Sequence, residues 1–469
     1  MMQLATSESL EEIDSAFASG LERAKATNRS VLVSFVTPVC ATPDPITVFA
    51  SMDKEKGRWF WGNTDEEFWL VGSGSCSTVP TDGQLSLNNT LAEQSDLFVN
   101  ALIQKPDIKG VGPVMMGGIR YDPSTIKDEM WQHFPDTLFV LPRILFTWSR
   151  GQVWLTFNEL VHPSLTQAPN ARVILNSAAA GNLDGSFLAE QPRILYETEG
   201  TEEQWNTGVS RILHLIGNNE VSKIVLARKK ILHAEQPFSV TLAISRLSKA
   251  YPECSIFGFQ QSEDSFIGAT PERLVKVESG TLNVSCLAGT APRGSNPIRD
   301  QEIRNELLNS PKERWEHSVV VKMIAETLSG FCDNLRWSDQ PEVVQLKDIQ
   351  HLSTPFESKL SANSHILEVL DKLHPTPAVA GTPTDKALSI ISQLEGDRGW
   401  YAAPVGWFDS VGDGEFRIAI RSALISYDKA VLFAGCGIVA GSDASKEFRE
   451  AVLKLQPLTE ALRPGDAII

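Results

Sequence analysis

Cysteine is scarce in this chain of 469 residues, and its six cysteines form no recognisable binding or crosslinking motif. They stand at positions 40, 76, 254, 286, 332 and 436, with no CxxC pair and no Cys/His spacing typical of a zinc site. Neither a zinc site nor a disulfide framework is predicted, and a reducing compartment, the cytoplasm, is expected.

Long apolar runs and basic segments are also missing. No run approaches the roughly 20 apolar residues of a membrane-spanning helix, and the acidic N-terminal sequence lacks the features of a secretory signal. The 58 acidic and 42 basic side chains give a net charge of −16. This charge opposes binding to nucleic acid or to an anionic membrane, but a local cationic pocket can still bind a small anionic substrate.

The composition, with 42% hydrophobic and 21% charged residues, is that of a globular protein. Residues 1–200 contain many runs of aromatic and β-branched residues punctuated by Gly, Asp and Asn, which predict strands. Tryptophans in such strand patterns more often pack in the core than form a platform for a ligand. No catalytic or binding site is predicted in these residues. Ionisable side chains interrupt apolar patterns only in residues 201–469.

Two such side chains are candidates for acid–base chemistry. Lys223 opens the apolar run KIVLAR. It either reaches solvent from the end of a strand or is buried, and burial favours the neutral form that acts as a base. Glu272 follows the apolar run SFIGAT and a proline, so it is either a well-placed acid or a solvated turn residue.

The segment SPKERWEHSVVVKMIAETL predicts a helix capped by Ser310, with a proline at its first position. Glu313, three residues after the cap, is explained by the capping pattern itself. Glu316 lies three, four and seven residues before apolar positions, which places it on the stripe facing the core. A carboxylate on that stripe needs a cation as partner.

The stretch GCGIVAGSDASKEFREAVLK joins glycines to a second helix with carboxylates. An apolar run at 431–434 predicts a buried strand, and the glycines after it allow a tight turn and a close approach to a carboxylate or phosphate. The helix that follows places Glu447, Glu450 and Lys454 on one face. An ordinary strand, turn and solvated helix is the alternative for this window.

A further strand is predicted over 416–425, where Arg421 interrupts an apolar run. A buried guanidinium needs a carboxylate, and that carboxylate belongs either to the protein or to a ligand.

Nine motifs in order along residues 205–465 resemble those of chorismate-utilising enzymes: KIVLAR, FIGATPERL, LAGT, KERWEH, HPTPAVAG, GWYAAPVGW, FRIAIRSA, GCGIVAGS and KEFREAVLK. That family includes isochorismate, salicylate and aminodeoxychorismate synthases and the large subunits of anthranilate synthase. The resemblance implies an α/β (α+β) fold with a two-sheet core and helices outside. Residues 1–200 would form its variable half and residues 201–469 its chorismate-binding catalytic region.

The resemblance also implies a Mg2+ site and residue roles. Glu316 and Glu450 would bind Mg2+ directly, with Glu313 and Glu447 as indirect partners. Chorismate would be held by Gly289, Thr290, Tyr401, Arg421, Lys454 and the backbone at Gly435, Cys436 and Gly437. Lys223, when neutral, would activate the water that attacks C2 of chorismate, and a protonated Glu272 would protonate the departing C4 hydroxyl.

Lys223 stands where the anthranilate enzymes carry glutamine, which argues against addition of ammonia at C2. The loop HPTPAVAG resembles that of isochorismate synthases, whereas amino-transferring relatives read more like PxGTVSGAPK. The resemblance therefore favours an isochorismate synthase that needs no glutaminase subunit, acts as a monomer or weak dimer, and serves menaquinone or phylloquinone biosynthesis. A salicylate synthase, an aminodeoxychorismate or anthranilate-type subunit, and a chorismate-binding regulator without turnover are the alternatives, and siderophore or salicylate supply is the alternative pathway.

Overall fold

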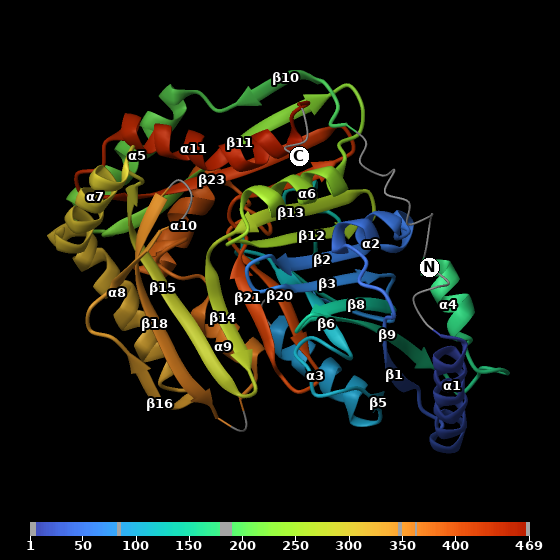
Figure 1. Ribbon diagram of the computed structural model, residues 1–469. Coiled ribbons are helices and arrows are strands. Elements are labelled where there is room, and N and C mark those ends of the chain that lie inside the picture. The colour runs from blue at the N-terminus through green and yellow to red at the C-terminus, as the bar shows by residue number, and fades with distance from the viewer. Residues whose placement is uncertain (1–5, 82–85, 179–189, 346–348, 362–363, 466–469) are drawn as a thin grey trace.

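The computed structural model describes residues 6–81, 86–178, 190–345, 349–361 and 364–465 (Figure 1). Their strands form two large sheets, and helices lie outside these sheets. The predicted α/β fold with a two-sheet core is therefore confirmed. None of the helices in these ranges combines the length and the apolar character needed to cross a membrane.

The first sheet has thirteen strands. Twelve follow the order β10-β11-β23-β22-β13-β12-β2-β3-β8-β9-β1-β5, and β19 pairs with β11. The bounds are β1 Val31–Pro38, β2 Arg58–Asn63, β3 Phe68–Ser73, β5 Leu102–Gln104, β8 Ile144–Ser149, β9 Gln152–Val161, β10 Ile194–Glu199, β11 Lys223–Ala234, β12 Ser255–Gln261, β13 Asp264–Thr270, β19 Gly381–Thr382, β22 Ser422–Ser426 and β23 Lys429–Val439.

The second sheet has ten strands. Nine follow the order β16-β18-β15-β14-β21-β20-β6-β7-β4, and β17 pairs with β18. The bounds are β4 Ser77–Thr81, β6 Val114–Ile119, β7 Thr137–Leu141, β14 Arg273–Glu278, β15 Thr281–Pro292, β16 Cys332–Trp337, β17 Glu342–Gln345, β18 Ile349–Leu360, β20 Pro404–Asp409 and β21 Gly414–Ile418.

Helix α8 packs on β15 and helix α11 packs on β23, so the two helices cover different sheets. Helix α8 begins at the predicted cap, where Ser310 Oγ accepts the N–H of Glu313 at 3.3 Å, and α11 begins after Asp443, whose side chain accepts the N–H of Lys446 at 2.8 Å. The helices are α1 Ser7–Thr27, α2 Pro45–Ser51, α3 Ser86–Val99, α4 Ala171–Ala178, α5 Glu202–Gly217, α6 Val240–Ala250, α7 Pro297–Asn309, α8 Pro311–Leu328, α9 Ile366–Leu373, α10 Thr384–Glu395 and α11 Ala444–Leu462, with short 3-10 helices η1 Lys54–Lys56 and η2 Glu129–Trp131.

Two of the points at which the chain crosses between the two sheets lie next to each other. One crossing joins β13 to β14, and the other joins β21 to β22. The hydroxyl of Thr270 donates to the carbonyl of Ile418 at 2.6 Å, and the N–H of Ile418 donates to the carbonyl of Glu272 at 3.0 Å. Glu272 and Arg421 therefore lie on adjacent crossings that hold each other in place.

The prediction of one continuous strand over 416–425 is wrong, because β21 and β22 belong to different sheets. Arg421 has a left-handed backbone conformation, with φ of 50°, at the point where the chain changes sheets. Few non-glycine residues adopt this conformation. The bend turns an apolar pattern that reads as a single strand into two.

Both sheets take strands from both halves of the chain. Strands β1 to β10 come from residues before 200, and they contribute to each sheet beside strands from later residues. The boundary predicted near residue 200 thus does not coincide with a break between the sheets. That residues 1–200 form a variable half and residues 201–469 the catalytic region stays a prediction.

Candidate active site

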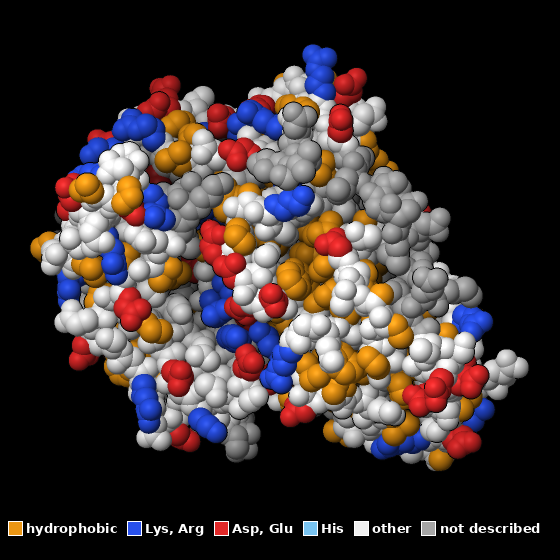
Figure 2. All heavy atoms as spheres, in the orientation of Figure 1, with side chains coloured by type: hydrophobic (Ala, Val, Ile, Leu, Met, Phe, Trp, Pro, Cys, Tyr) orange, Lys and Arg blue, Asp and Glu red, His pale blue; other side chains and the backbone are white. Residues whose placement is uncertain are grey.

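A pocket of about 220 Å³ lies where the two crossings meet helices α8 and α11. Figure 2 shows charged side chains of both signs around a hollow on this face of the molecule. Every predicted site residue except Cys436 lines the pocket, namely Lys223, Glu272, Gly289, Thr290, Glu313, Glu316, Tyr401, Arg421, Gly435, Gly437, Glu447, Glu450 and Lys454. The chain thus brings together residues that are more than 200 positions apart.

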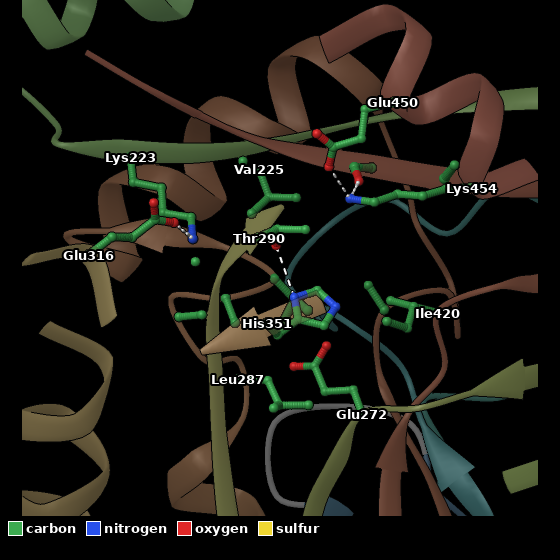
Figure 3. A pocket seen from close by; sticks show the side chains of 18 of the residues that line it. Lys223, Val225, Glu272, Leu287, Thr290, Glu316, His351, Ile420, Glu450 and Lys454 are labelled. Atoms are coloured by element: carbon green, nitrogen blue, oxygen red, sulfur yellow. Dashed lines mark hydrogen bonds and ion pairs between the residues drawn. The ribbon is translucent and has the colours of Figure 1, made fainter. Parts of the chain in front are cut away.

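Lys223 forms an ion pair inside the pocket. As the first residue of β11 it is only 8% exposed, and its Nζ lies 2.5 Å from Glu316 Oε1 on α8. Figure 3 shows this pair at one side of the pocket, with Glu450 and Lys454 at another and Glu272 below them. Lys223 therefore does not reach bulk solvent from the strand end, and Glu316 has the cationic partner that its position on the apolar stripe requires.

Glu272 faces the pocket without any hydrogen-bond donor to its carboxyl group among the described residues. Burial raises the pKa of Glu272 to about 7, although Lys223, Lys454 and Arg421 all act to lower it. Removal from water disfavours the charged form of a carboxyl group. A substantial fraction of Glu272 therefore carries its proton near neutral pH, as an acid catalyst must.

The guanidinium of Arg421 lines the pocket and has no ion-pair or hydrogen-bond partner in the described part of the chain. Beside it Tyr401 stacks on Phe433, with ring centroids 5.0 Å apart, and burial raises the pKa of Tyr401. A half-buried cation without an internal carboxylate is available to an anionic ligand. The described residues supply no internal carboxylate for Arg421, and its binding to a ligand stays a prediction.

Strand β23 runs straight through Gly435 and Gly437, so the turn predicted at these two glycines is wrong. Their role is close approach: a Cβ at Gly437 would lie 2.9 Å from Lys223 Cε, and one at Gly435 would lie 3.0 Å from the hydroxyl of Tyr401. Bare backbone at both positions leaves room for the pocket. The chain turns only later, at Gly441, whose φ is 82°.

The backbone N–H groups of β23 alternate in direction. Val225 and Ala227 on β11 pair with Gly437 and Gly435, but they donate their N–H groups away from β23, to Ala380 and to Glu395. Hydrogen-bonded and non-hydrogen-bonded pairs alternate in an antiparallel ladder. The N–H groups of Gly435 and Gly437 therefore point away from β11 and are available, as predicted for an anion cradle.

Cys436 differs from its two neighbours, and its predicted place in the cradle needs correction. In the same ladder its N–H faces Leu226 on β11, and its side chain is buried with Sγ 3.3 Å from the carbonyl of Glu447. Cys436 thus packs under helix α11 and does not line the pocket.

The four predicted metal-binding glutamates line the pocket in two pairs. On α8, burial and the nearby Glu316 raise the pKa of Glu313. On α11, burial and the nearby Glu450 raise the pKa of Glu447. Each pair therefore concentrates negative charge that a cation would relieve, and an all-oxygen set of this kind suits Mg2+.

Two of these glutamates, Glu316 and Glu450, form ion pairs with lysines of the pocket. Glu450 Oε1 lies 2.7 Å from Lys454 Nζ, which also donates to the carbonyl of Gly435 at 3.0 Å. Burial acts to raise the pKa of Glu450, but Lys454 more than offsets it and the pKa is lowered. Glu450 is thus held as a carboxylate.

Sequence reasoning missed His351, which lies at the centre of the pocket in Figure 3. Its Nδ1 is 2.9 Å from Thr290 Oγ1, and β15 and β18 pair these two residues next to a bulge at Gly289. Burial, followed by Lys454 and Arg421, lowers the pKa of His351 to about 3, so the imidazole is neutral. Only the pairing of the two strands reveals this residue, because a single histidine in a strand pattern carries no local signal.

Comparison with known proteins gives the same family over almost the whole chain. The profile of the chorismate binding enzyme family matches residues 19–463. Isochorismate synthase MenF of Bacillus subtilis is 34% identical over 94% of this chain and 96% of its own length. The salicylate biosynthesis isochorismate synthase of Pseudomonas aeruginosa is 32% identical over 97% of this chain and 95% of its own length.

Solved structures agree on the fold. The menaquinone-specific isochorismate synthase MenF of Escherichia coli superposes with a TM-score of 0.76 at 22% identity, covering 96% of this chain and all of that one. Anthranilate synthase component I of Streptococcus pneumoniae superposes with a TM-score of 0.66 at 19% identity, covering 84% of this chain and 92% of that one. The resemblance predicted from the motifs is confirmed, and the chain belongs to the chorismate binding enzyme family.

Proposed function

We propose that the protein is an isochorismate synthase, an isomerase that adds water at C2 of chorismate and removes the C4 hydroxyl. The observation that carries this proposal is that Lys223 and Glu272 line the same pocket, so a candidate base and a partly protonated acid face one space. The names of two nearly full-length relatives, both isochorismate synthases, support it.

Binding of the substrate rests on the cations of the pocket. Arg421, which has no partner among the described residues, pairs with a carboxylate of chorismate. The N–H groups of Gly435 and Gly437, which point away from β11, donate to the same anion. The hydroxyl of Tyr401 lies beside these groups. A local cluster of this kind lets a protein with a net charge of −16 bind an anion.

The reaction needs a base that takes a proton from the attacking water and an acid that gives a proton to the departing hydroxyl. Lys223 leaves Glu316 and, in its neutral form, removes a proton from water as the water oxygen bonds to C2. The ring double bond shifts, the C4–O bond breaks, and Glu272 gives its proton to the departing hydroxyl, which leaves as water. Lys223 ends protonated and Glu272 ends ionised, so a proton must return before the next cycle.

Mg2+ is the cofactor that the residues of the site suit best. Glu316 and Glu450 would hold it directly, and Glu313 and Glu447 through water, because four carboxylates with crowded charge match the oxygen ligands and retained waters that Mg2+ prefers. When bound, the ion supplies positive charge that orients the ring carboxylate of chorismate.

The pathway, compartment and partners belong to the proposal as well. The menaquinone-specific MenF of Escherichia coli, which shares the fold over 96% of this chain, favours a role in menaquinone supply. The Pseudomonas relative supports salicylate supply as the alternative. Free cysteines throughout the described chain support a reducing cytoplasm. Because water is the nucleophile, no glutaminase subunit is needed, and the enzyme acts as a monomer or weak dimer.

Product analysis tests the function directly. The purified chain, given chorismate and Mg2+ alone, is expected to form isochorismate, separated by chromatography and identified by mass. Release of salicylate and pyruvate would instead indicate a salicylate synthase, and an aminated product after addition of ammonium would indicate an amino-transferring enzyme. Binding of chorismate without any product would show that the protein is a regulator.

A further inference from the structure

A second, much smaller cavity lies directly behind Glu272. It leaves about 10 Å³ for the centre of a water molecule, and it shares Glu272, Leu287 and Ala378 with the main pocket. Glu272 is therefore part of the wall between the two cavities.

The hydroxyl of Thr376 lines the small cavity and has no hydrogen-bond partner among the described residues. Thr376 is only 4% exposed, and its carbonyl accepts the N–H groups of Val379 and Ala380, which fix the residue in its loop. Buried hydroxyl groups nearly always have a partner, because leaving one unpaired costs free energy. The carboxyl group of Glu272 likewise has no hydrogen-bond donor among the described residues.

The size and lining of the cavity determine which molecule can occupy it. A space of about 10 Å³ is close to the minimum that holds one water, and a buried water needs two to four polar partners. Thr376, Glu272, Ser285 and the buried thiol of Cys286 are the polar side chains of the lining that could serve it. Arg273 also lines the cavity, but its guanidinium pairs with Glu415 and Glu66, and the rest of the wall is apolar. A solute larger than water does not fit.

We propose that this cavity binds a single water molecule that connects the hydroxyl of Thr376 to the carboxyl group of Glu272, and that Thr376 is a positioning residue for the acid. The role rests on the proposed function. A protonated carboxyl group has one O–H donor and one acceptor oxygen. Water that donates to the acceptor oxygen from behind turns the O–H toward the substrate.

The first test is structural and does not depend on activity. A high-resolution crystal structure of the full chain is expected to show an ordered water within hydrogen-bond distance of Thr376 Oγ1 and Glu272. In Thr376→Val, which keeps the shape of the side chain and loses the hydroxyl, that water is expected to disappear. An empty cavity in the wild-type structure, or a water that stays in the variant, would overturn the proposal.

The second test is kinetic. Thr376→Val is expected to lower kcat about 10- to 100-fold with little change in KM, because the acid is misoriented while binding is kept. Thr376→Ser is expected to restore the rate. The matched control is Thr137→Val, since Thr137 on β7 is also a buried hydroxyl without a partner but lies outside the pocket.

The pH profile separates positioning from general damage. The charged groups that face Glu272 are Lys223 on β11, Lys454 on α11 and Arg421 on the β21–β22 crossing, and Thr376→Val changes none of them. Loss of a polar neighbour disfavours the ionised acid, so the alkaline limb of kcat/KM is expected to move up by about half a pH unit or more. An unchanged kcat and profile would refute the role of Thr376. The acid role itself fails separately if Glu272→Gln keeps full activity.

Discussion

The ionisation of Glu272 makes a prediction that needs no substrate. Burial raises the pKa of this carboxyl group from 4.5 to about 7 in the folded protein. The associated stability is fully present below pH 4.5 and is lost as the pH rises through about 7, because the folded protein must then hold a buried charge. The difference corresponds to roughly 3 kcal/mol of unfolding free energy.

Glu272→Gln keeps the shape of the side chain and is neutral at every pH. We therefore expect the variant to be more stable than the wild type by up to about 3 kcal/mol at about pH 8.5, and equally stable at about pH 4. Thermal unfolding of both proteins at the two pH values measures this difference. Glu326→Gln, at an exposed position of α8, is the matched control and should show no such dependence.

The same variant tests the acid. Removal of a general acid typically lowers a rate about 10²- to 10⁴-fold, so Glu272→Gln should be nearly inactive while it melts later at alkaline pH. A stability difference that is the same at both pH values would refute the raised pKa. Wild-type turnover in the variant would refute the catalytic role.

Further expectations concern the base, the anion cradle and the metal. Lys223→Ala should abolish turnover and leave a folded protein by circular dichroism; wild-type rates would remove its role as base. Arg421→Gly should raise KM about 10- to 100-fold through loss of a charge-assisted pair, while the melting temperature holds because glycine accepts the φ of 50°; an unchanged KM would show that Arg421 does not bind substrate. Gly437→Ala should lower kcat about 100-fold by displacing Lys223, whereas Gly217→Ala, with open space around it, should not. EDTA should remove activity and Mg2+ should restore it; activity that survives exhaustive chelation would contradict the metal site.

Local signals in the sequence predicted the elements that carry the site. The cap at Ser310 lies at the start of α8, and Lys223 begins β11, as expected. A cap or an apolar run acts within a few residues, so it can be read without knowledge of the rest of the fold.

Features that depend on the pairing of distant strands could not be predicted from such local signals. The break in the predicted strand at Arg421 arises because the two parts join different sheets, and Cys436 is excluded from the cradle because its N–H faces β11. His351 and Thr376 become notable only beside Thr290 and Glu272. Tertiary pairing decides each of these cases, and no spacing along the chain encodes it.

The amino-terminal half supports the pocket indirectly, through contacts to residues that line it. No residue before Lys223 lines the pocket in the described part of the chain, yet the hydroxyl of Tyr121 donates to the carbonyl of Val379 at 3.2 Å, and His374 Nε2 lies 3.2 Å from the carbonyl of Tyr121. Arg398 lies over the ring of Tyr121 and donates to the same carbonyl of Val379 at 2.9 Å.

These contacts fix the loop that carries Thr376, Ala378 and Val379, and therefore one wall of both cavities beside Glu272. The first half also supports Phe433, a lining residue on which Trp131 stacks with ring centroids 5.7 Å apart. Because its described residues support lining residues and do not line the pocket themselves, its sequence needs to supply a firm support and no reactive group. A strand-rich half without recognisable chemistry is what such a support requires.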